Sequence, residues 1–205
     1  MPVESCGGDV RHRLPQLRSG QFPPPDAGRV LIDGTTYRML VHPARTVGAV
    51  LDSARSHPGS TGRDHLRTYA ALSGIARPRV DEVIDLVDMG GFADRRTGGF
   101  STGMRQRLHL ATALLGDPPI LLLDEPGNGL DPAGTAWLHR FLADCAAEGR
   151  TVLVSSHVLA ELEEVAHDVV LIDQGRLVSA ASLPEVRGAH RTLTESFLAL
   201  TGGTT

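Results

Sequence analysis

Residues 120–132 read ILLLDEPGNGLDP, and this stretch decides the fold. The run Ile120–Leu123 is apolar throughout, which is typical of a strand buried on both faces at the centre of a parallel sheet. It ends in two adjacent carboxylates, Asp124 and Glu125. The closing Asp-Pro pair has the pattern of a helix N-cap followed by the first helical residue. A buried strand followed by a helix predicts an α/β protein with a mostly parallel sheet.

The alternation of strands and helices extends in both directions from this stretch. Apolar residues at helical spacing predict helices over 62–75, 79–89, 102–115, from 132 onward, and 158–166. Short apolar or β-rich runs predict strands at 28–34, 47–51, 151–154, 168–172 and 176–179. Residues 1–27 are rich in Gly, Pro and Arg and show neither periodicity, so we expect a loop or disorder there.

Composition excludes several classes of protein. The 205 residues suffice for one domain with a sizeable core, and the net charge of −4 gives no reason to expect nucleic-acid binding through bulk charge. Cys6 and Cys145 form no CxxC pattern, which argues against a disulfide framework or a zinc site and fits a reducing compartment. No apolar run approaches the roughly 20 residues of a membrane span, so we expect any membrane role to come through a partner.

The chain contains no lysine, because all 20 residues counted as Lys+Arg are arginine. A GxxxxGK[ST] loop, which supplies a lysine and backbone N–H groups to nucleotide phosphates, is therefore impossible in this chain.

The acidic pair carries the first chemical hypothesis. Ligands of open parallel sheets lie at the carboxyl ends of the strands, where Asp124 and Glu125 are expected. Two acids at that edge suit Mg²⁺ handling by one and activation of a water by the other. The alternative is an acidic turn after a core strand.

Three further segments have both a structural and a functional interpretation. In FSTGMRQR, residues 100–107, Ser101 is either a plain N-cap or, with Gly103 and the first free N–H groups of the helix, a phosphate-binding group. In VLVSSH, residues 152–157, His157 is either a surface histidine or a donor to a phosphate or a water. The NGLDP stretch before the helix at 132 is a capping turn on either interpretation.

Together, in this order and spacing, these segments resemble the ABC transporter ATPase family. FSTGM resembles its LSGGQ signature, ILLLDEP its Walker B strand with the catalytic glutamate, NGLD its D-loop and SSH its switch histidine. GRVLIDG resembles the segment after the P-loop helix, and DVVLIDQGRLV and LTESFLALTG resemble the C-terminal part of drug-exporter-type members. The resemblance covers residues 22–202 and implies a P-loop NTPase-like sheet in a domain of residues 28–202, with a helical signature subdomain at about 60–117.

The resemblance also implies roles for single residues. It makes Asp124 the ligand of Mg²⁺ through water, Glu125 the general base and His157 the sensor of the γ-phosphate. Because family members sandwich ATP between two subunits, it places Ser101 and Gly103 on the partner subunit's nucleotide. The remaining implied nucleotide-binding positions are Met104 in the signature, Asp131 in the D-loop and Asp52 at the Q-loop position.

Three departures accompany the resemblance. Thr102 and Met104 replace a glycine and a glutamine of the signature, and an acid, Asp52, stands where the family has the Q-loop glutamine. Residues 1–27 match neither the P-loop nor its strand, which lies inside the family's sheet. We therefore expect the strand at 168–172 to lack a neighbour on one side.

The resulting hypothesis is an ATP-binding and ATP-hydrolysing subunit of an ABC transporter that energises export, with ATP and Mg²⁺ as cofactors and with a truncated or frame-shifted start. It implies a cytoplasmic protein held on the inner face of the membrane by a transmembrane permease, paired as a homo- or heterodimer, with no nucleic-acid partner. One alternative is a nonhydrolytic subunit that lends its signature to an intact ATPase. Another is an ABC-type ATPase of DNA repair or translation, against which the absence of the usual insertions and second cassette argues.

Overall fold

The computed structural model describes residues 27–51 and 56–202 of the chain. These residues divide between two compact units, one within 37–156 and the other made of 27–36 and 157–202, and each unit is considered by itself. The loop predicted over residues 1–27 lies outside the described residues except for its last position. The predicted boundaries at 28–202 and about 60–117 stay predictions.

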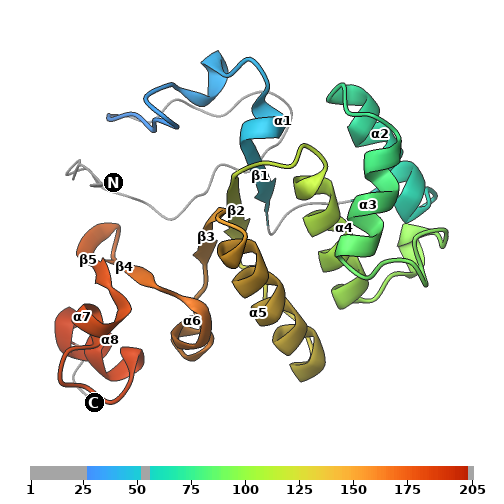
Figure 1. Cartoon of the computed structure of the whole chain (residues 1–205). Helices are drawn as coiled ribbons and strands as arrows, with labels where there is room; N and C mark the ends of the chain where they lie inside the picture. Colours follow the sequence, from blue (N-terminus) through green and yellow to red (C-terminus); the bar gives the residue numbers. More distant parts are fainter. Residues whose placement is uncertain (1–26, 52–55, 203–205) are drawn as a thin grey trace. The chain divides into compact units, whose positions relative to one another are not determined.

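The unit Tyr37–Ser156 contains a three-stranded parallel sheet in the order β1-β2-β3 (Figure 1). Strands β1 (Val47–Val50), β2 (Ile120–Asp124) and β3 (Thr151–Ser155) confirm the predicted strands and the parallel pairing. The middle strand is the most deeply buried, because Leu121 and Leu123 are at most 1% exposed. Among the described residues β3 pairs only with β2, and its Leu153 is 55% exposed.

This unit has four longer helices, and their positions confirm the predicted ones. They are α2 (Gly62–Leu72), α3 (Pro78–Leu86), α4 (Thr102–Leu114) and α5 (Pro132–Ala147). Helices α2, α3 and α4 pack on one another, α4 packs on β1, and α5 packs on β3 (Figure 1). The short helices η1 (Tyr37–Met39), α1 (Pro43–Thr46) and η2 (Thr97–Gly99) complete the unit. The apolar stripes of the longer helices and the sheet share one core, whose fully buried members include Leu66, Val83, Met89, Leu108, Leu114 and Leu121.

Two glycines allow the close contacts around β1. A Cβ on Gly48 would lie 2.4 Å from the carbonyl oxygen of Ala113, so glycine is required for α4 to approach the strand. A Cβ on Gly116, just after α4, would lie 1.8 Å from the carbonyl oxygen of Ala44 in α1. The backbone of one segment therefore packs directly on the backbone of another at both positions, which holds the C-terminal end of α4 close to β1 and α1.

The other unit contains an antiparallel pair of strands, β4 (Asp168–Asp173) and β5 (Arg176–Ser182). Helices α6 (Leu159–Val165), α7 (Leu183–Arg187) and α8 (Leu193–Thr201) belong with them. Val169, Leu171, Val186 and Leu193 form the buried core of this unit. Within the described residues β4 pairs only with β5, and the expectation that the strand at 168–172 lacks a neighbour on one side stays a prediction.

The strand predicted at 28–34 is wrong, although its turn is right. Asp33 and Gly34 both have positive φ and form a two-residue turn flanked by a single bridge between Ile32 and Thr35. Val30 is 80% exposed and Leu31 43% exposed, so neither side chain is buried by the part of the chain that the structure describes. No helix among the described residues has the length and apolar character needed to cross a membrane.

We expect Leu121→Ala to lower the free energy of unfolding of this unit by about 2–5 kcal/mol, because it empties a fully buried position in β2. Urea denaturation followed by the fluorescence of Trp137, the only tryptophan, measures the change. Leu153→Ala is the matched control, since that leucine also lies in a strand of the sheet but is largely exposed. Equal losses from the two variants would contradict the position of the core.

Candidate functional site

The site is built around the end of β2, where Asp124 and Glu125 leave the sheet. The last paired residues of the two strands are Asp124 and Ser155, which are register partners. The hydroxyl of Ser155 donates to Asp124 Oδ1 at 2.7 Å and so fixes the orientation of that carboxylate. The sequence analysis did not identify Ser155 as a site residue, because a serine two residues before a histidine does not by itself indicate a function.

The same serine holds the backbone of Glu125 in an unusual conformation. Glu125 has a φ of 48°, a left-handed value that costs a non-glycine residue about 1–2 kcal/mol. Its N–H donates to the carbonyl oxygen of Ser155 at 3.1 Å and to its hydroxyl oxygen at 3.0 Å. These bonds offset the conformational cost, and the chain turns so that the two neighbouring carboxylates diverge at the sheet edge.

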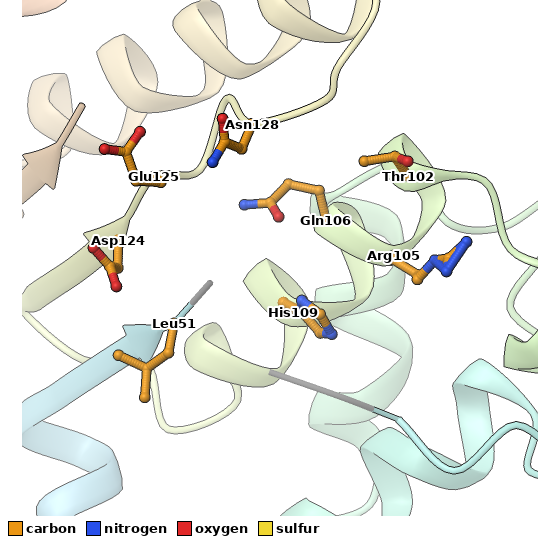
Figure 2. Close-up of a pocket in the computed structure, with 8 residues that line it drawn as sticks. All are labelled: Leu51, Thr102, Arg105, Gln106, His109, Asp124, Glu125 and Asn128. Carbon is orange, nitrogen blue, oxygen red and sulfur yellow. The ribbon is translucent and has the colours of Figure 1, made fainter. Parts of the chain in front are cut away.

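A pocket of about 250 Å³ opens beside this edge. Figure 2 shows its walls, with Asp124 at the end of β2 and Glu125 just after it on one side and residues of α4 on the other. The structure therefore brings the acidic pair together with the helix that begins at the FSTGM segment. The lining residues are Leu51, Thr102, Arg105, Gln106, His109, Asp124, Glu125 and Asn128.

The start of α4 confirms the predicted N-cap. Ser101 precedes the helix, and its hydroxyl oxygen accepts from the N–H of Met104 at 3.2 Å. The side chain of Met104 is partly buried and packs against the core, whereas Gly103 is partly exposed at the helix start. Thr102 is the signature residue that lines the pocket. A phosphate contact by Ser101, Gly103 or Met104 stays a prediction.

The NGLD turn lies against this helix start. A Cβ on Gly129 would lie 3.4 Å from the methyl carbon of Thr102, and one on Gly103 would lie 3.8 Å from Leu130. Asp131 is the N-cap of α5, as predicted, and its carboxylate accepts from the N–H of Gly134 at 2.7 Å.

Two predicted site residues are not placed at the pocket. His157 follows β3 and belongs to the unit that contains β4 and β5, so its contact with the acidic pair stays a prediction. Asp52 lies outside the described residues, directly after the pocket residue Leu51.

The polar wall on α4 was not found from the sequence. Gln106 and His109 lie three residues apart on one face of the helix, within a stretch that reads as part of a helical stripe. Burial, and to a smaller extent the nearby charges of His65 and Arg105, lower the pKa of His109 to about 4. Burial also lowers the pKa of His65, on α2. The imidazole of His109 is therefore neutral at pH 7.

The sheet order, the acidic strand end and the capped helix start define the class of protein, which is an α/β nucleotide-binding type of fold. The family profile described as ABC transporter matches residues 16–128, which is more than half of the chain. The chain belongs to the ABC transporter family.

Individual relatives and solved structures agree with this assignment. The chain is 33% identical over 174 residues to the bacitracin transport ATP-binding protein BcrA of Enterococcus faecalis, a match that covers 83% of this chain and 56% of BcrA. It is 28% identical over 152 residues to the lantibiotic transport ATP-binding protein SrtF of Streptococcus pyogenes, covering 74% and 66%. The structure of an ATP-binding subunit of an ABC transporter superposes with a TM-score of 0.73 at 25% identity, covering 86% of this chain and 77% of that one.

A dimeric ATP-binding cassette bound to ADP and Pi shares the fold, with a TM-score of 0.68 at 22% identity and coverage of 78% and 75%. These superpositions confirm the predicted fold class. The chain spans about half the length of the first curated relatives that it matches, between 52% and 57%.

We expect Ser155→Ala to lower the free energy of unfolding by about 1–2 kcal/mol, because Asp124 loses a donor and the strained Glu125 peptide loses one of its two acceptors. Urea denaturation of the full chain measures the change. Ser73→Ala, at an exposed position just after α2, is the control and should change stability by less than about 0.5 kcal/mol.

His109 predicts a loss of stability in acid. Its pKa falls from 6.5 to about 4 on folding, so the unfolded chain binds more protons between these pH values and stability is lost as pH falls through that window. The contribution is at most about 3 kcal/mol. His109→Leu should flatten the dependence of the urea midpoint on pH between 7 and 4.5, leaving the smaller part due to His65. His190→Leu, at an exposed position, should leave it unchanged, and equal slopes in all three proteins would refute the assignment.

Proposed function

We propose that this chain is the ATP-binding and ATP-hydrolysing part of a subunit that energises export through an ABC transporter. The observation that carries the proposal is the acidic pair at the end of a central parallel strand, tied to β3 by Ser155 and facing α4 across one pocket. Ligands of open α/β sheets bind at this edge.

The donor set at the pocket fits Mg²⁺. Magnesium prefers oxygen ligands, keeps several waters and is held in nucleotide sites by one or two carboxylates. Asp124 is the acid whose orientation is fixed, since one of its oxygens accepts from Ser155 and the other stays available to a metal-bound water. Asp124 is therefore the residue that would hold the ion through water, and the ion would supply charge neutralisation at the phosphates.

The residues of the chain then have distinct roles in the proposed reaction. Glu125 accepts the proton of the attacking water, because it follows Asp124 directly and lines the same pocket. The helix dipole and free N–H groups at the start of α4 favour a phosphate, which Ser101 and Gly103 would contact on the partner subunit's nucleotide. Met104, Asp131 and Asp52 complete the proposed nucleotide contacts. His157 is proposed as the γ-phosphate sensor.

The relatives support the transport role and its direction. Their names assign bacitracin transport, lantibiotic transport and, for a protein of Burkholderia thailandensis that is 33% identical over 177 residues, Nod factor export. We accordingly propose a cytoplasmic location on the inner face of the membrane, through a transmembrane permease subunit. The proposal includes a homo- or heterodimer of ATPase subunits and no nucleic-acid partner.

Without lysine, the chain has no P-loop lysine to bind the β- and γ-phosphates. We therefore propose that the chain on its own binds Mg-ATP no more tightly than about 1 mM. The chain's second candidate function follows from the same fact. A nonhydrolytic subunit that presents Ser101 and Gly103 to the nucleotide of an intact ATPase would need no phosphate loop of its own.

Hydrolysis by the native complex, purified through a tag on this chain, separates the two functions. If this chain hydrolyses ATP, Glu125→Gln should lower kcat at least about 100-fold at nearly constant KM, since the general base is lost. If it only lends its signature, Ser101→Arg should abolish hydrolysis while Glu125→Gln leaves it unchanged.

Glu148→Gln is the matched control. Glu148 is an exposed acid at the end of α5, so this substitution makes the same chemical change away from the pocket. It should leave kcat and KM unchanged. A complex in which neither Glu125→Gln nor Ser101→Arg alters hydrolysis would eliminate both functions.

A further inference from the structure

The first turns of α4 and α5 pack on the same side chain of the NGLD turn. Leu130 lies between them, because a Cβ on Gly103 of α4 would be 3.8 Å from its Cδ2 atom and one on Gly134 of α5 would be 3.3 Å from its Cβ atom. Leu130 is itself partly buried against the core. Each helix therefore has a glycine where the leucine packs, and the two helix starts are joined by van der Waals contact.

Thr102 makes a second contact between the start of α4 and this turn. A Cβ on Gly129 would lie 3.4 Å from the Cγ2 methyl carbon of Thr102, so the methyl group fills the space beside the turn. Gly129 has a φ of 71°, which favours glycine, so a side chain from the turn would occupy this space only with strain. Figure 2 shows Thr102, on α4, and Asn128, in the turn, among the residues that line the pocket.

The contact of Thr102 lies beside the capping residues of both helices. Ser101, directly before Thr102, is the N-cap of α4, and Asp131, two residues after Gly129, is the N-cap of α5. Two backbone hydrogen bonds, each 3.1 Å long, close the turn that follows β2, so the turn moves as one piece. A contact at Gly129 therefore sets the spacing between the two caps.

We infer that Thr102 is a positioning residue of the proposed site: its methyl group keeps the two capping residues, Ser101 and Asp131, at a fixed spacing. Both caps are among the proposed nucleotide contacts, and Ser101 serves the nucleotide of the partner subunit, so the inference rests on the proposed function. Thr102 stands where the signature that this segment resembles has a glycine, which carries no methyl group. The start of α4 and the NGLD turn then meet the nucleotide as one preorganised surface.

Two substitutions separate the methyl group of Thr102 from its hydroxyl group. Thr102→Ser removes the methyl and keeps the hydroxyl, whereas Thr102→Val keeps the methyl and removes the hydroxyl. In the native complex we expect Thr102→Ser to lower kcat about 10-fold, as for misplaced reacting groups, with KM changed less than about twofold. Thr102→Val, which restores the methyl contact, should recover kcat to within about twofold of the unaltered complex.

The reverse pattern, with kcat lost in Thr102→Val and kept in Thr102→Ser, would mean that the hydroxyl group acts and would overturn the inference. Equal losses in the two variants, or a loss in neither, would overturn it as well.

The stability of the full chain distinguishes positioning from a structural role. Thr102 is exposed, so Thr102→Ser should leave the urea midpoint of Trp137 fluorescence unchanged. A lowered midpoint together with a raised KM would mean that the variant loosens the fold, and the inference would be wrong. Thr68→Ser is the matched control, since it removes the same methyl group from an exposed position on α2 and keeps the hydroxyl that donates to the carbonyl oxygen of Asp64. It should change neither kcat nor KM.

Ser101→Arg, measured in parallel, separates failure of this inference from failure of the proposed function. If Ser101→Arg abolishes hydrolysis and Thr102→Ser does not lower it, the proposed role of the α4 start stands and the role of Thr102 is rejected. If Ser101→Arg leaves hydrolysis unchanged, the start of α4 serves no nucleotide, and the inference is rejected together with that part of the proposed function.

Discussion

The hydroxyl of Ser155 is the interaction on which the arrangement of the site depends. One oxygen donates to Asp124 and accepts from the N–H of Glu125, so it sets a carboxylate and a left-handed backbone at the same time. Both bonds cross between neighbouring parallel strands, which means that the sheet register itself positions the acids. A loop of comparable length would hold these two side chains with far less precision, because its own backbone would need other partners.

A second side chain that accepts two hydrogen bonds, Asp88, joins three helices of this unit. Asp88, at the end of α3, has a φ of 55° and accepts from Arg107 of α4 and from the indole N–H of Trp137 on α5, each at 3.0 Å. The guanidinium of Arg107 also lies 3.8 Å from the centre of the Trp137 ring. Three helices therefore meet at one carboxylate. These contacts fix α4, which forms one wall of the pocket, relative to the NGLD turn before α5.

Local patterns predicted most of the strands and helices, while the contacts between them required the structure. The uniform run before Asp124 identified β2, and the Asp-Pro pair identified the start of α5, because burial and capping leave marks in consecutive residues. The strand at 28–34 failed because β propensity without a packing partner yields only a turn. Ser155 and the methyl contact of Thr102 escaped notice because their importance arises from partners about 30 residues away in the chain.

Gly116 has a consequence for the history of this sequence. Every single-base change in a glycine codon that replaces glycine by another amino acid introduces a Cβ, and at this position the Cβ would collide with the carbonyl oxygen of Ala44. Replacement of this glycine, eight residues before Asp124 in the chain, is therefore expected to be selected against. A substitution there would push α1 and β1 away from the end of α4, and through the pairing of β1 with β2 it would reach the strand that carries Asp124.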